Sequence, residues 1–175
     1  MLTDEEMRAR MVNGWRGGLH DGTVCGIGST MESTARARDW LPCVCHEYGI
    51  RSVNDAGAGD LHWMRHVEWG GITVRYFDLI PRSGEILQLD ITKQTMPRAD
   101  VILCRHVLNH LDSIRIGMAL DRFRECASYL IATQFDRFDG SREFTRVDLR
   151  AWLGDPLQST NDGGADNCKL SLWKI

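Results

Sequence analysis

The sequence predicts an α/β fold, in which a doubly wound, mostly parallel sheet forms the middle of three layers and carries an antiparallel strand at its C-terminal end. Short apolar runs alternate with helical patterns from residue 50 to residue 135, which is typical of a parallel sheet covered on both faces. A glycine-rich turn, "DAGAGD", follows the first apolar run. An alternating segment, "KLSLWKI", closes the chain and predicts the antiparallel strand.

Length and composition bound the class of protein. The chain has 175 residues, of which 43% are hydrophobic and 26% charged, so a globular domain with a real core is expected. A net charge of −3 argues against a general nucleic-acid coat. No apolar run approaches the ~20 residues that cross a bilayer, and the charged N-terminus lacks the apolar core of a signal peptide. We therefore expect a single cytoplasmic domain over residues 1–175, with a helical cap region (1–48), a core (49–175) and no membrane segment.

Two helices are predicted in the cap region, over residues 3–12 and 31–48, with an irregular glycine-rich segment between them. Thr3 and Glu6 form a capping box at the start of the first helix. Pro42 predicts a kink or a break in the second helix.

Strands and helices alternate through the core in a Rossmann-like pattern. Parallel strands are predicted over residues 50–55, 72–79, 85–91, 99–104 and 128–135. Helices are predicted over residues 60–67 and 112–127. The core candidates of the second helix are Ile114, Met118, Leu120 and Phe123.

After residue 136 the pattern weakens. Residues 145–153 are predicted as a short helix capped by Thr145, and residues 154–167 as a loop because of their composition. Residues 169–175 are predicted as a strand at or near an edge of the sheet.

Asp55, Gly57 and Gly59 lie at the end of the first predicted strand. In open parallel sheets, ligands bind beyond the carboxyl ends of the strands, where the strand order reverses. Glycines at that place permit a tight turn and a close approach of a ligand to the backbone. The helix predicted after the turn would offer its N-terminal amides to an anionic group. This turn therefore marks the predicted binding site.

Two further acids end the next two strands. Asp78 follows Asp55 by 23 residues, which is where an acid commonly receives ribose hydroxyls. A carboxylate suits that task because it accepts two hydrogen bonds from a cis-diol. Asp90 ends the third strand and could accept from an exocyclic amine of a base. The alternative is that all three acids are ordinary caps or loop residues.

The turn departs from the phosphate-binding patterns. Position 62 is His, so the third glycine of G-x-G-x-x-G is missing, and the P-loop pattern is missing as well. A nucleoside ligand without a phosphate chain fits this turn better, and S-adenosylmethionine is one such ligand.

Four stretches resemble the motifs of class I S-adenosylmethionine-dependent methyltransferases. They are "NDAGAGDLHWM", "YFDLI", "LDIT" and "ADVILCRHVLNHL", and together they cover about residues 50–135. More loosely, "GIGSTMESTARARDWLP" and "KLSLWKI" resemble a subgroup of small methyltransferase-like proteins. In that subgroup the first motif often reads D-x-P-C-G-D-F-x-W-M, and this chain has Gly57 and Ala58 in place of its Pro and Cys.

The resemblance implies a site for S-adenosylmethionine. The first motif would surround the methionine part, the acid of the second strand would hold the ribose, and that of the third would flank the adenine. Thr30 would reach the methionine carboxylate, unless it is an ordinary helix N-cap. The cofactor-binding residues implied are Thr30, Asp55, Ala56, Gly57, Gly59, Asp78, Leu79, Asp90, Ile91 and Arg105.

Methyl transfer from a sulfonium is an in-line displacement that needs orientation above all, and a base only when the acceptor arrives protonated. The predicted catalytic residues are Arg105, His106 and His110. The two histidines are four residues apart, so a helix would stack them on one face. The pair could also bind a metal, but no Glu completes an H-E-x-x-H pattern, and a purely structural role for each histidine stays open.

Other chemistries are disfavoured. Cys43, Cys45 and His46 cluster without the second ligand pair of a zinc finger, so no metal is expected. "CRHV" stands where DNA amino-methyltransferases have [DNS]-P-P-[YFW], which argues against DNA amino-methylation. The predicted function is methyl transfer to oxygen or nitrogen of an unidentified substrate, small molecule or macromolecule. The alternatives are a non-catalytic binding or inhibitor protein and an enzyme that cleaves the cofactor, and the chain could form a homo-oligomer.

Overall fold

The computed structural model describes residues 4–14, 19–135, 147–163 and 168–175. In these residues a seven-stranded sheet runs in the order β3-β2-β1-β4-β5-β7-β6. Its strands are β1 (Ser52–Ala56), β2 (Thr73–Asp78), β3 (Ile86–Gln88), β4 (Val101–Cys104), β5 (Tyr129–Phe135), β6 (Gln158–Asn161) and β7 (Cys168–Lys174). Strands β1 to β5 pair in parallel, whereas β7 is antiparallel to both β5 and β6. The predicted fold class is therefore confirmed.

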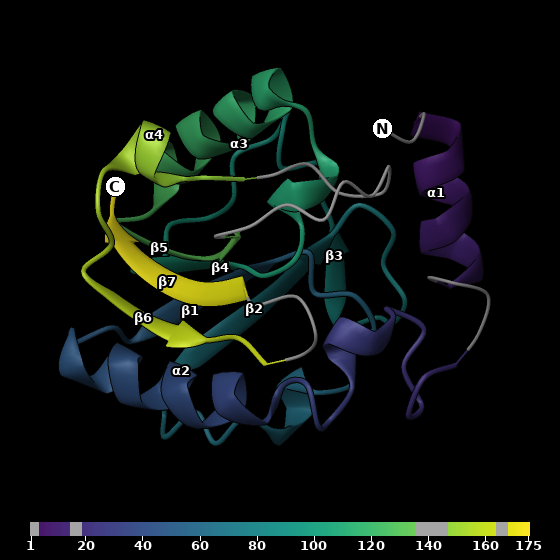
Figure 1. Cartoon of the computed structure of the whole chain (residues 1–175), viewed down its shortest axis with the longest axis horizontal. Helices are drawn as coiled ribbons and strands as arrows, with labels where there is room; N and C mark the ends of the chain where they lie inside the picture. The colour runs from purple at the N-terminus through teal and green to yellow at the C-terminus, as the bar shows by residue number, and fades with distance from the viewer. Residues whose placement is uncertain (1–3, 15–18, 136–146, 164–167) are drawn as a thin grey trace.

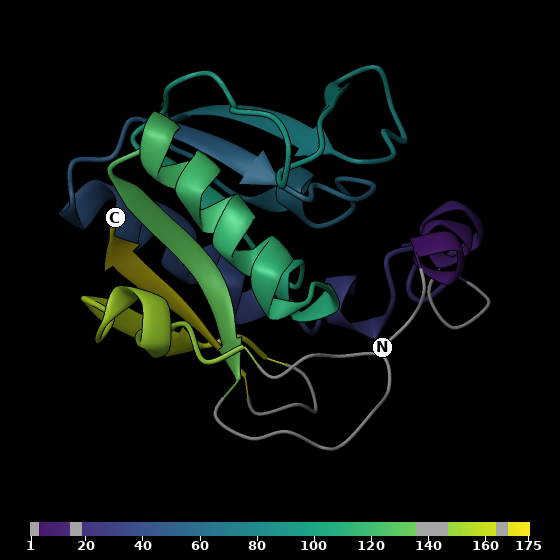
Figure 2. The same ribbon diagram turned by 90° about the horizontal axis from the view of Figure 1, so that it is seen from above.

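Helices cover both faces of the sheet. α3 (Ser113–Cys126) and α4 (Arg150–Leu153) lie on one face, and α2 (Ala35–Glu47) lies on the other (Figure 1). α1 (Asp4–Asn13) stands apart from these layers in two perpendicular views (Figure 1 and Figure 2). Single 3₁₀ turns are η2 (Ile27–Ser29), η3 (Met64–His66) and η4 (Leu108–His110). Among the described residues, no helix combines the length and the apolar character needed to cross a membrane.

The strand order reverses between β1 and β4. The chain leaves β1 for β2 and β3 on one side, and it continues to β4 and β5 on the other. Asp55 of β1 lies in register with Tyr76 of β2 and Leu103 of β4. The carboxyl ends of these strands therefore meet at the place where doubly wound folds bind ligands.

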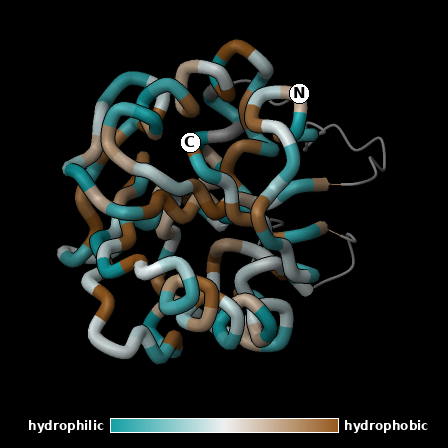
Figure 3. Tube along the Cα trace, turned by 90° about the vertical axis from the view of Figure 1, so that its left-hand side faces the viewer, coloured by the Kyte–Doolittle hydropathy of each residue, from teal (hydrophilic) through white to brown (hydrophobic). Residues whose placement is uncertain are grey.

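Apolar side chains pack on both faces of the sheet. Val101 and Leu103 of β4 belong to the core under α2, whereas Ile102 and Cys104 belong to the core under α3. This is the two-residue alternation of a strand that is buried on both faces. Figure 3 shows hydrophobic segments running through the middle of the molecule.

Only some of the residues predicted to be buried on α3 are buried in the structure. The prediction is confirmed for Leu120 and Phe123, which are buried, but it is wrong for Ile114 and Met118, which are 76% and 43% exposed. The buried positions of α3 are Ile116, Ala119, Leu120, Phe123 and Cys126. They follow the i, i+3, i+4, i+7 spacing of one helix face, and positions 114 and 118 lie opposite to it.

The helix predicted over residues 60–67 is wrong, because this segment contains only the single turn η3. Leu61 is fully buried in the core under α2 and has a φ of 60°. A left-handed residue cannot continue a right-handed helix, so the chain folds as turns here. The helix N-terminus expected after the glycine turn therefore does not exist.

The loop predicted over residues 154–167 contains the strand β6, so this prediction is wrong in part. The sequence of β6, "QSTN", is polar, and it forms an edge strand by pairing with β7. β7 itself is antiparallel, as predicted, and lies next to that edge.

Other boundaries shift by a few residues. The strand predicted over 85–91 shortens to β3, and α2 continues through Pro42 without ending there. In the described part of the helix predicted over 145–153, only α4 is helical. Thr3 and Thr145, predicted as caps, lie outside the described residues.

Two isoleucines of α3 provide a matched test of this packing. Ile116→Ala should lower the free energy of unfolding by about 2–5 kcal/mol, because it leaves a cavity in the core under α3. Ile114→Ala, two residues earlier on the exposed face, should change it by less than about 0.5 kcal/mol. Urea denaturation of both variants measures the difference, and equal losses would contradict this placement of the helix.

Candidate functional site

Asp55, Asp78 and Arg105 come together at the carboxyl ends of β1, β2 and β4. Asp55 is buried, with 3% of its surface exposed, and no described residue hydrogen-bonds to its carboxyl group. Burial, together with the charge of Asp78, raises the pKa of Asp55 to about 8, and the charge of Arg105 opposes this rise. The first two predicted acids and the predicted arginine therefore lie within electrostatic reach of one another.

Asp78 holds the glycine turn in place. Its two carboxylate oxygens accept hydrogen bonds from the backbone amides of Gly59 and Ile80, each at 2.9 Å. Burial raises the pKa of Asp78, and these two hydrogen bonds oppose the rise. Asp78 thus shapes the turn from the neighbouring strand.

Asp90 is engaged within its own turn. Its Oδ1 accepts from the backbone amide and the hydroxyl of Thr92, and its Oδ2 lies 2.8 Å from Nζ of Lys93. Burial opposes ionisation, but the hydrogen bonds from Lys93 and Thr92 outweigh it and hold the pKa of Asp90 below its usual range. This carboxylate thus already has local partners, as in the alternative of an ordinary loop acid. Ile91, the next residue, packs against the core under α3.

The glycines of the turn are required by the protein's own packing. Gly57 has a φ of +98°, and the place of a side chain is filled by Val107. Gly59 has a φ of +64°, and Sγ of Cys25 lies 2.6 Å from the position that a Cβ would take. Packing against Val107 and Cys25 therefore explains why both positions are glycine, without a bound ligand.

The backbone amides of the turn are also occupied. Those of Gly57 and Ala58 both donate to the carbonyl oxygen of Phe77, and that of Gly59 donates to Asp78. With these amides used and no helix following, the turn offers no anion-binding nest. This agrees with the prediction of a ligand that carries no phosphate chain.

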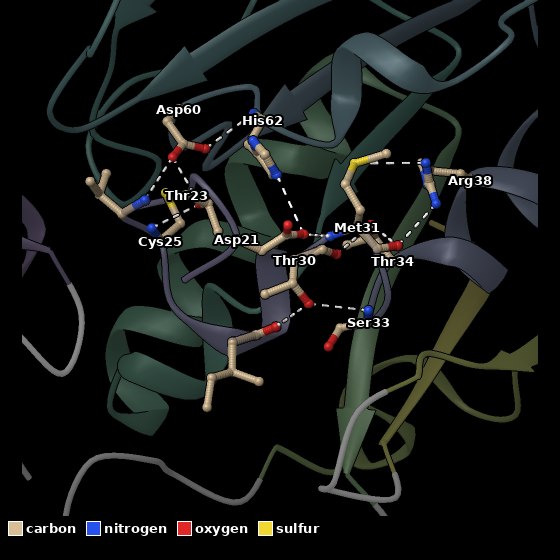
Figure 4. A network of polar contacts seen from close by, with 12 residues as sticks. Asp21, Thr23, Cys25, Thr30, Met31, Ser33, Thr34, Arg38, Asp60 and His62 are labelled. Carbon is tan, nitrogen blue, oxygen red and sulfur yellow. Dashed lines mark hydrogen bonds and ion pairs between the residues drawn. The ribbon is translucent and has the colours of Figure 1, made fainter. Parts of the chain in front are cut away.

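A segment before α2, residues 19–34, folds against this turn, and we call it the N-terminal loop. Asp60 tethers it: its Oδ2 accepts from the hydroxyl of Thr23 at 2.8 Å and from the backbone amide of Val24 at 2.9 Å (Figure 4). Its Oδ1 accepts from the amide of His62. Burial opposes ionisation, but these hydrogen bonds hold the pKa of Asp60 below its usual range.

Thr30 lies in the N-terminal loop and has a local role. Its hydroxyl donates to the carbonyl of Ile27 at 3.0 Å and accepts from the amide of Ser33 at 3.2 Å (Figure 4). Thr30 is not the helix N-cap of the alternative prediction, because the N-cap of α2 is Thr34.

Arg105 is the buried cation of the site. Its Nε donates to Oδ1 of Asp162 at 2.7 Å, and its guanidinium carbon lies 5.2 Å from the ring centre of Trp63. Its Nη2 is buried and has no hydrogen-bond partner among the described residues. An unpaired buried donor costs about 1–3 kcal/mol, more for a charged group, so this nitrogen marks a place where an acceptor is missing.

Asn109 adds a second unpaired group to the segment after β4. The residue is 2% exposed, and neither Nδ2 nor Oδ1 of its amide has a partner in the described part of the chain. Two such residues within five positions distinguish this segment from an ordinary loop.

His106 follows β4 with a φ of 54°. Its backbone amide donates to the hydroxyl of Thr133, and its Nε2 lies 3.1 Å from Oδ2 of Asp162 and 3.9 Å from Sγ of Cys168. The edge of its ring packs on Phe135, with 5.9 Å between ring centres. The side chain is about one quarter exposed.

The predicted stacking of His106 and His110 on one helix face is wrong. His106 is left-handed, and the following residues form only the single turn η4, which includes His110. Cys43, Cys45 and His46, which are neighbours in the sequence, have different surroundings, because Cys45 is buried in the core while Cys43 and His46 are exposed.

The sequence prediction missed Asp162 and Cys168. Asp162 is fully buried, and the charges and hydrogen bonds of Arg105 and His106 outweigh its burial and hold its pKa below the usual range. The only sequence signal is its place directly after the polar alternation "QSTN", which forms β6.

No protein-family model matches the chain, and no curated protein matches it by sequence. Many solved structures do match it by fold. The N-methyltransferase NodS from Bradyrhizobium japonicum WM9, in complex with S-adenosylhomocysteine, is 13% identical with a TM-score of 0.69, covering 97% of this chain and 96% of NodS. Magnesium protoporphyrin IX methyltransferase (ChlM) from Synechocystis PCC 6803, with bound S-adenosylmethionine, is 14% identical with a TM-score of 0.60, covering 99% and 92%. The methyltransferase domain of bacterial CtHen1 is 12% identical with a TM-score of 0.61, covering 82% and 100%. The chain therefore has the fold of the class I methyltransferases.

Two glycines with similar backbone angles test the packing of the turn. Gly71→Ala, at a φ of +89° in open space, should cost about 1–2 kcal/mol of stability for the left-handed backbone alone. Gly57→Ala should cost about 1–3 kcal/mol more, because its methyl group meets Val107. Chemical denaturation measures both, and the double variant with Val107→Ala should recover the difference. Equal costs at the two positions would show that Val107 does not fill the turn.

Proposed function

We propose that this chain is an S-adenosylmethionine-dependent methyltransferase that transfers a methyl group to an oxygen or nitrogen of its acceptor. The proposal is carried by two buried groups without hydrogen-bond partners in the described part of the chain, the carboxyl group of Asp55 and Nη2 of Arg105. Asp55 is a buried carboxyl group without a hydrogen-bond donor among the described residues, and Arg105 keeps a buried Nη2 without an acceptor. The likeness in fold to methyltransferases solved with S-adenosylmethionine or S-adenosylhomocysteine supports the same interpretation.

A zwitterionic amino acid satisfies both groups at once. A buried carboxylate that has lost its hydration needs an opposite charge, and the guanidinium of Arg105, already paired with Asp162 through Nε, needs an acceptor at Nη2. The ammonium of the methionine part would pair with Asp55, and its carboxylate would accept from Nη2 of Arg105. A phosphate group would instead bring a second negative charge to Asp55, so the pair favours an amino-acid ligand.

We infer that the other predicted cofactor contacts surround Asp55 and Arg105. Each oxygen of Asp78 accepts one backbone hydrogen bond, which leaves each with a further lone pair for a ribose hydroxyl. Leu79 would lie beside the ribose, and Asp90 and Ile91, one strand further, would flank the adenine. Thr30 would reach the methionine carboxylate only by turning its hydroxyl hydrogen from the carbonyl of Ile27 to the ligand. The backbone of Ala56, Gly57 and Gly59 would line the methionine part.

His106 is the proposed catalytic residue on the acceptor side. In the transfer, an acceptor oxygen or nitrogen bonds to the methyl carbon while the carbon–sulfur bond breaks and its electron pair stays on sulfur. S-adenosylhomocysteine leaves as product, and His106 receives the acceptor's proton. Asp162 holds the imidazole ring in place through Nε2. In this proposal Arg105 binds the cofactor. His110 provides a second imidazole near the acceptor.

The raised pKa of Asp55 predicts that cofactor affinity increases with pH. The carboxyl group has a pKa of about 8 without ligand, so at pH 6 it must lose a proton before it can pair with an ammonium group. The association constant for S-adenosylhomocysteine should rise roughly tenfold per pH unit below pH 7 and level off near pH 8. Calorimetric titration measures this, and Asp55→Asn should weaken binding and abolish the pH dependence. An affinity independent of pH would remove Asp55 from the site.

The same titration acts on stability with the opposite sign. The folded chain keeps the proton of Asp55 up to about pH 8, whereas the unfolded chain releases it near pH 4, so the free energy of unfolding should fall as the pH rises between these values. Without cofactor, Asp55→Asn should therefore be more stable than the natural chain at pH 8. This control separates weakened binding from loss of the fold.

Analysis of the reaction products distinguishes methyl transfer from cleavage of the cofactor and from binding without reaction. Incubation with methyl-labelled S-adenosylmethionine and an extract of potential acceptors should give S-adenosylhomocysteine and a labelled acceptor. His106→Asn should bind the cofactor unchanged but turn over about 10²–10⁴-fold more slowly. Release of methylthioadenosine instead would indicate cleavage of the cofactor, and binding without any product would indicate a non-catalytic protein.

A further inference from the structure

Three potential metal ligands converge beside the proposed acceptor position. They are Nε2 of His106 after β4, Oδ2 of Asp162 after β6, and Sγ of Cys168 at the start of β7. Asp162 and Cys168 are buried, and His106 is partly buried. Among the described residues this is the one group of three or more such side chains with mutually close ligand atoms.

We propose that His106, Asp162 and Cys168 bind one zinc ion through these three atoms and leave its fourth position open. Tetrahedral zinc has bonds of about 2.0–2.3 Å to nitrogen, oxygen and sulfur, which separates its ligand atoms by about 3.3–3.6 Å. The separations here are 3.1 Å from Nε2 to Oδ2, 3.9 Å from Nε2 to Sγ, and 3.9 Å from Oδ2 to Sγ. Shifts of a few tenths of an ångström in the side chains would complete the site.

The geometry distinguishes a metal site from a nucleophilic triad. In a cysteine–histidine–aspartate triad, the acid and the thiol address different nitrogens of the imidazole ring. Here Asp162 and Cys168 both approach Nε2 of His106. A single nitrogen cannot relay a proton between Asp162 and Cys168, but it can bind the same metal ion as these two side chains.

The donor set selects zinc over the hard cations. Magnesium and calcium take oxygen ligands, whereas a thiolate with an imidazole and a carboxylate suits zinc. The surrounding contacts resemble the outer shell of a metal site, because Oδ1 of Asp162 is held by Arg105 at 2.7 Å and the ring of His106 rests on Phe135. The carboxylate and the imidazole are thus already oriented.

Three protein ligands and one open position are the arrangement of catalytic zinc sites. If the proposed function holds, and only this step rests on it, an acceptor hydroxyl would occupy the open position, where the ion would lower its pKa and its proton would pass to solvent water, leaving an alkoxide oxygen to attack the methyl carbon. His106 would then act on the acceptor through the ion. Metal binding itself does not depend on the cofactor and is tested without it.

Cobalt(II) is the probe, because zinc has no spectrum. The full chain is stripped with a chelator and titrated with cobalt(II) under reducing, oxygen-free conditions. We expect one equivalent to bind, with the visible bands of tetrahedral cobalt and a thiolate-to-cobalt charge-transfer band, and one equivalent of zinc to displace it. Cys168→Ser should lose the charge-transfer band, and His106→Asn should lose the tetrahedral spectrum. Cys43→Ser, which removes an exposed thiol on α2, should keep both.

Absence of both bands in the natural chain, or a spectrum that survives in Cys168→Ser and disappears in Cys43→Ser, would overturn the proposal. The natural chain alone decides the first outcome, even if a variant fails to fold. Titration with S-adenosylhomocysteine in the same preparations keeps the two proposals apart. Loss of cofactor binding with intact cobalt bands would count against the proposed function and not against the metal site.

Discussion

The buried guanidinium of Arg105 is the interaction on which the rest of the site depends. A cation removed from water needs anions, acceptors or aromatic faces around it, and Arg105 has Asp162 and the ring of Trp63. These contacts join the end of β4 to the segment after β6, and they bring His106 and Cys168 alongside. They leave one nitrogen without a partner among the described residues, and the charge of Arg105 also acts on the buried carboxyl group of Asp55. An amino-acid zwitterion is the ligand chemistry that completes this arrangement.

The scaffold around Arg105 relies on side chains and loops where such folds often use helix ends. In the described chain, the connections from β1 to β4 contain no α-helix and only the single turn η3. The amides of the glycine turn are consumed by Phe77 and Asp78, and the N-terminal loop is tethered over the turn by Asp60. Recognition therefore rests on charged side chains at the strand ends, which suits a ligand with an amino-acid part better than one with a phosphate chain.

The sequence predicts what depends on local pattern and misses what depends on tertiary contacts. Apolar runs ending in Asp55 and Asp78 predict both the strands and the meeting of these acids, because parallel strands end at one edge. The helix predicted over 60–67 fails because Leu61, which is fully buried, has a left-handed backbone that no periodicity signals. β6 is missed because a polar edge strand has the composition of a loop. Asp162 and Cys168 reach His106 only through the pairing of β5, β6 and β7, so no spacing in the sequence reveals them.

The most direct measurement is a structure of the full chain with S-adenosylhomocysteine bound. We expect the ligand's carboxylate within hydrogen-bond distance of Nη2 of Arg105, its ammonium group against Asp55 and its sulfur on the side of His106. A ligand bound elsewhere, or one that leaves that nitrogen bare and Asp55 unpaired, would contradict it.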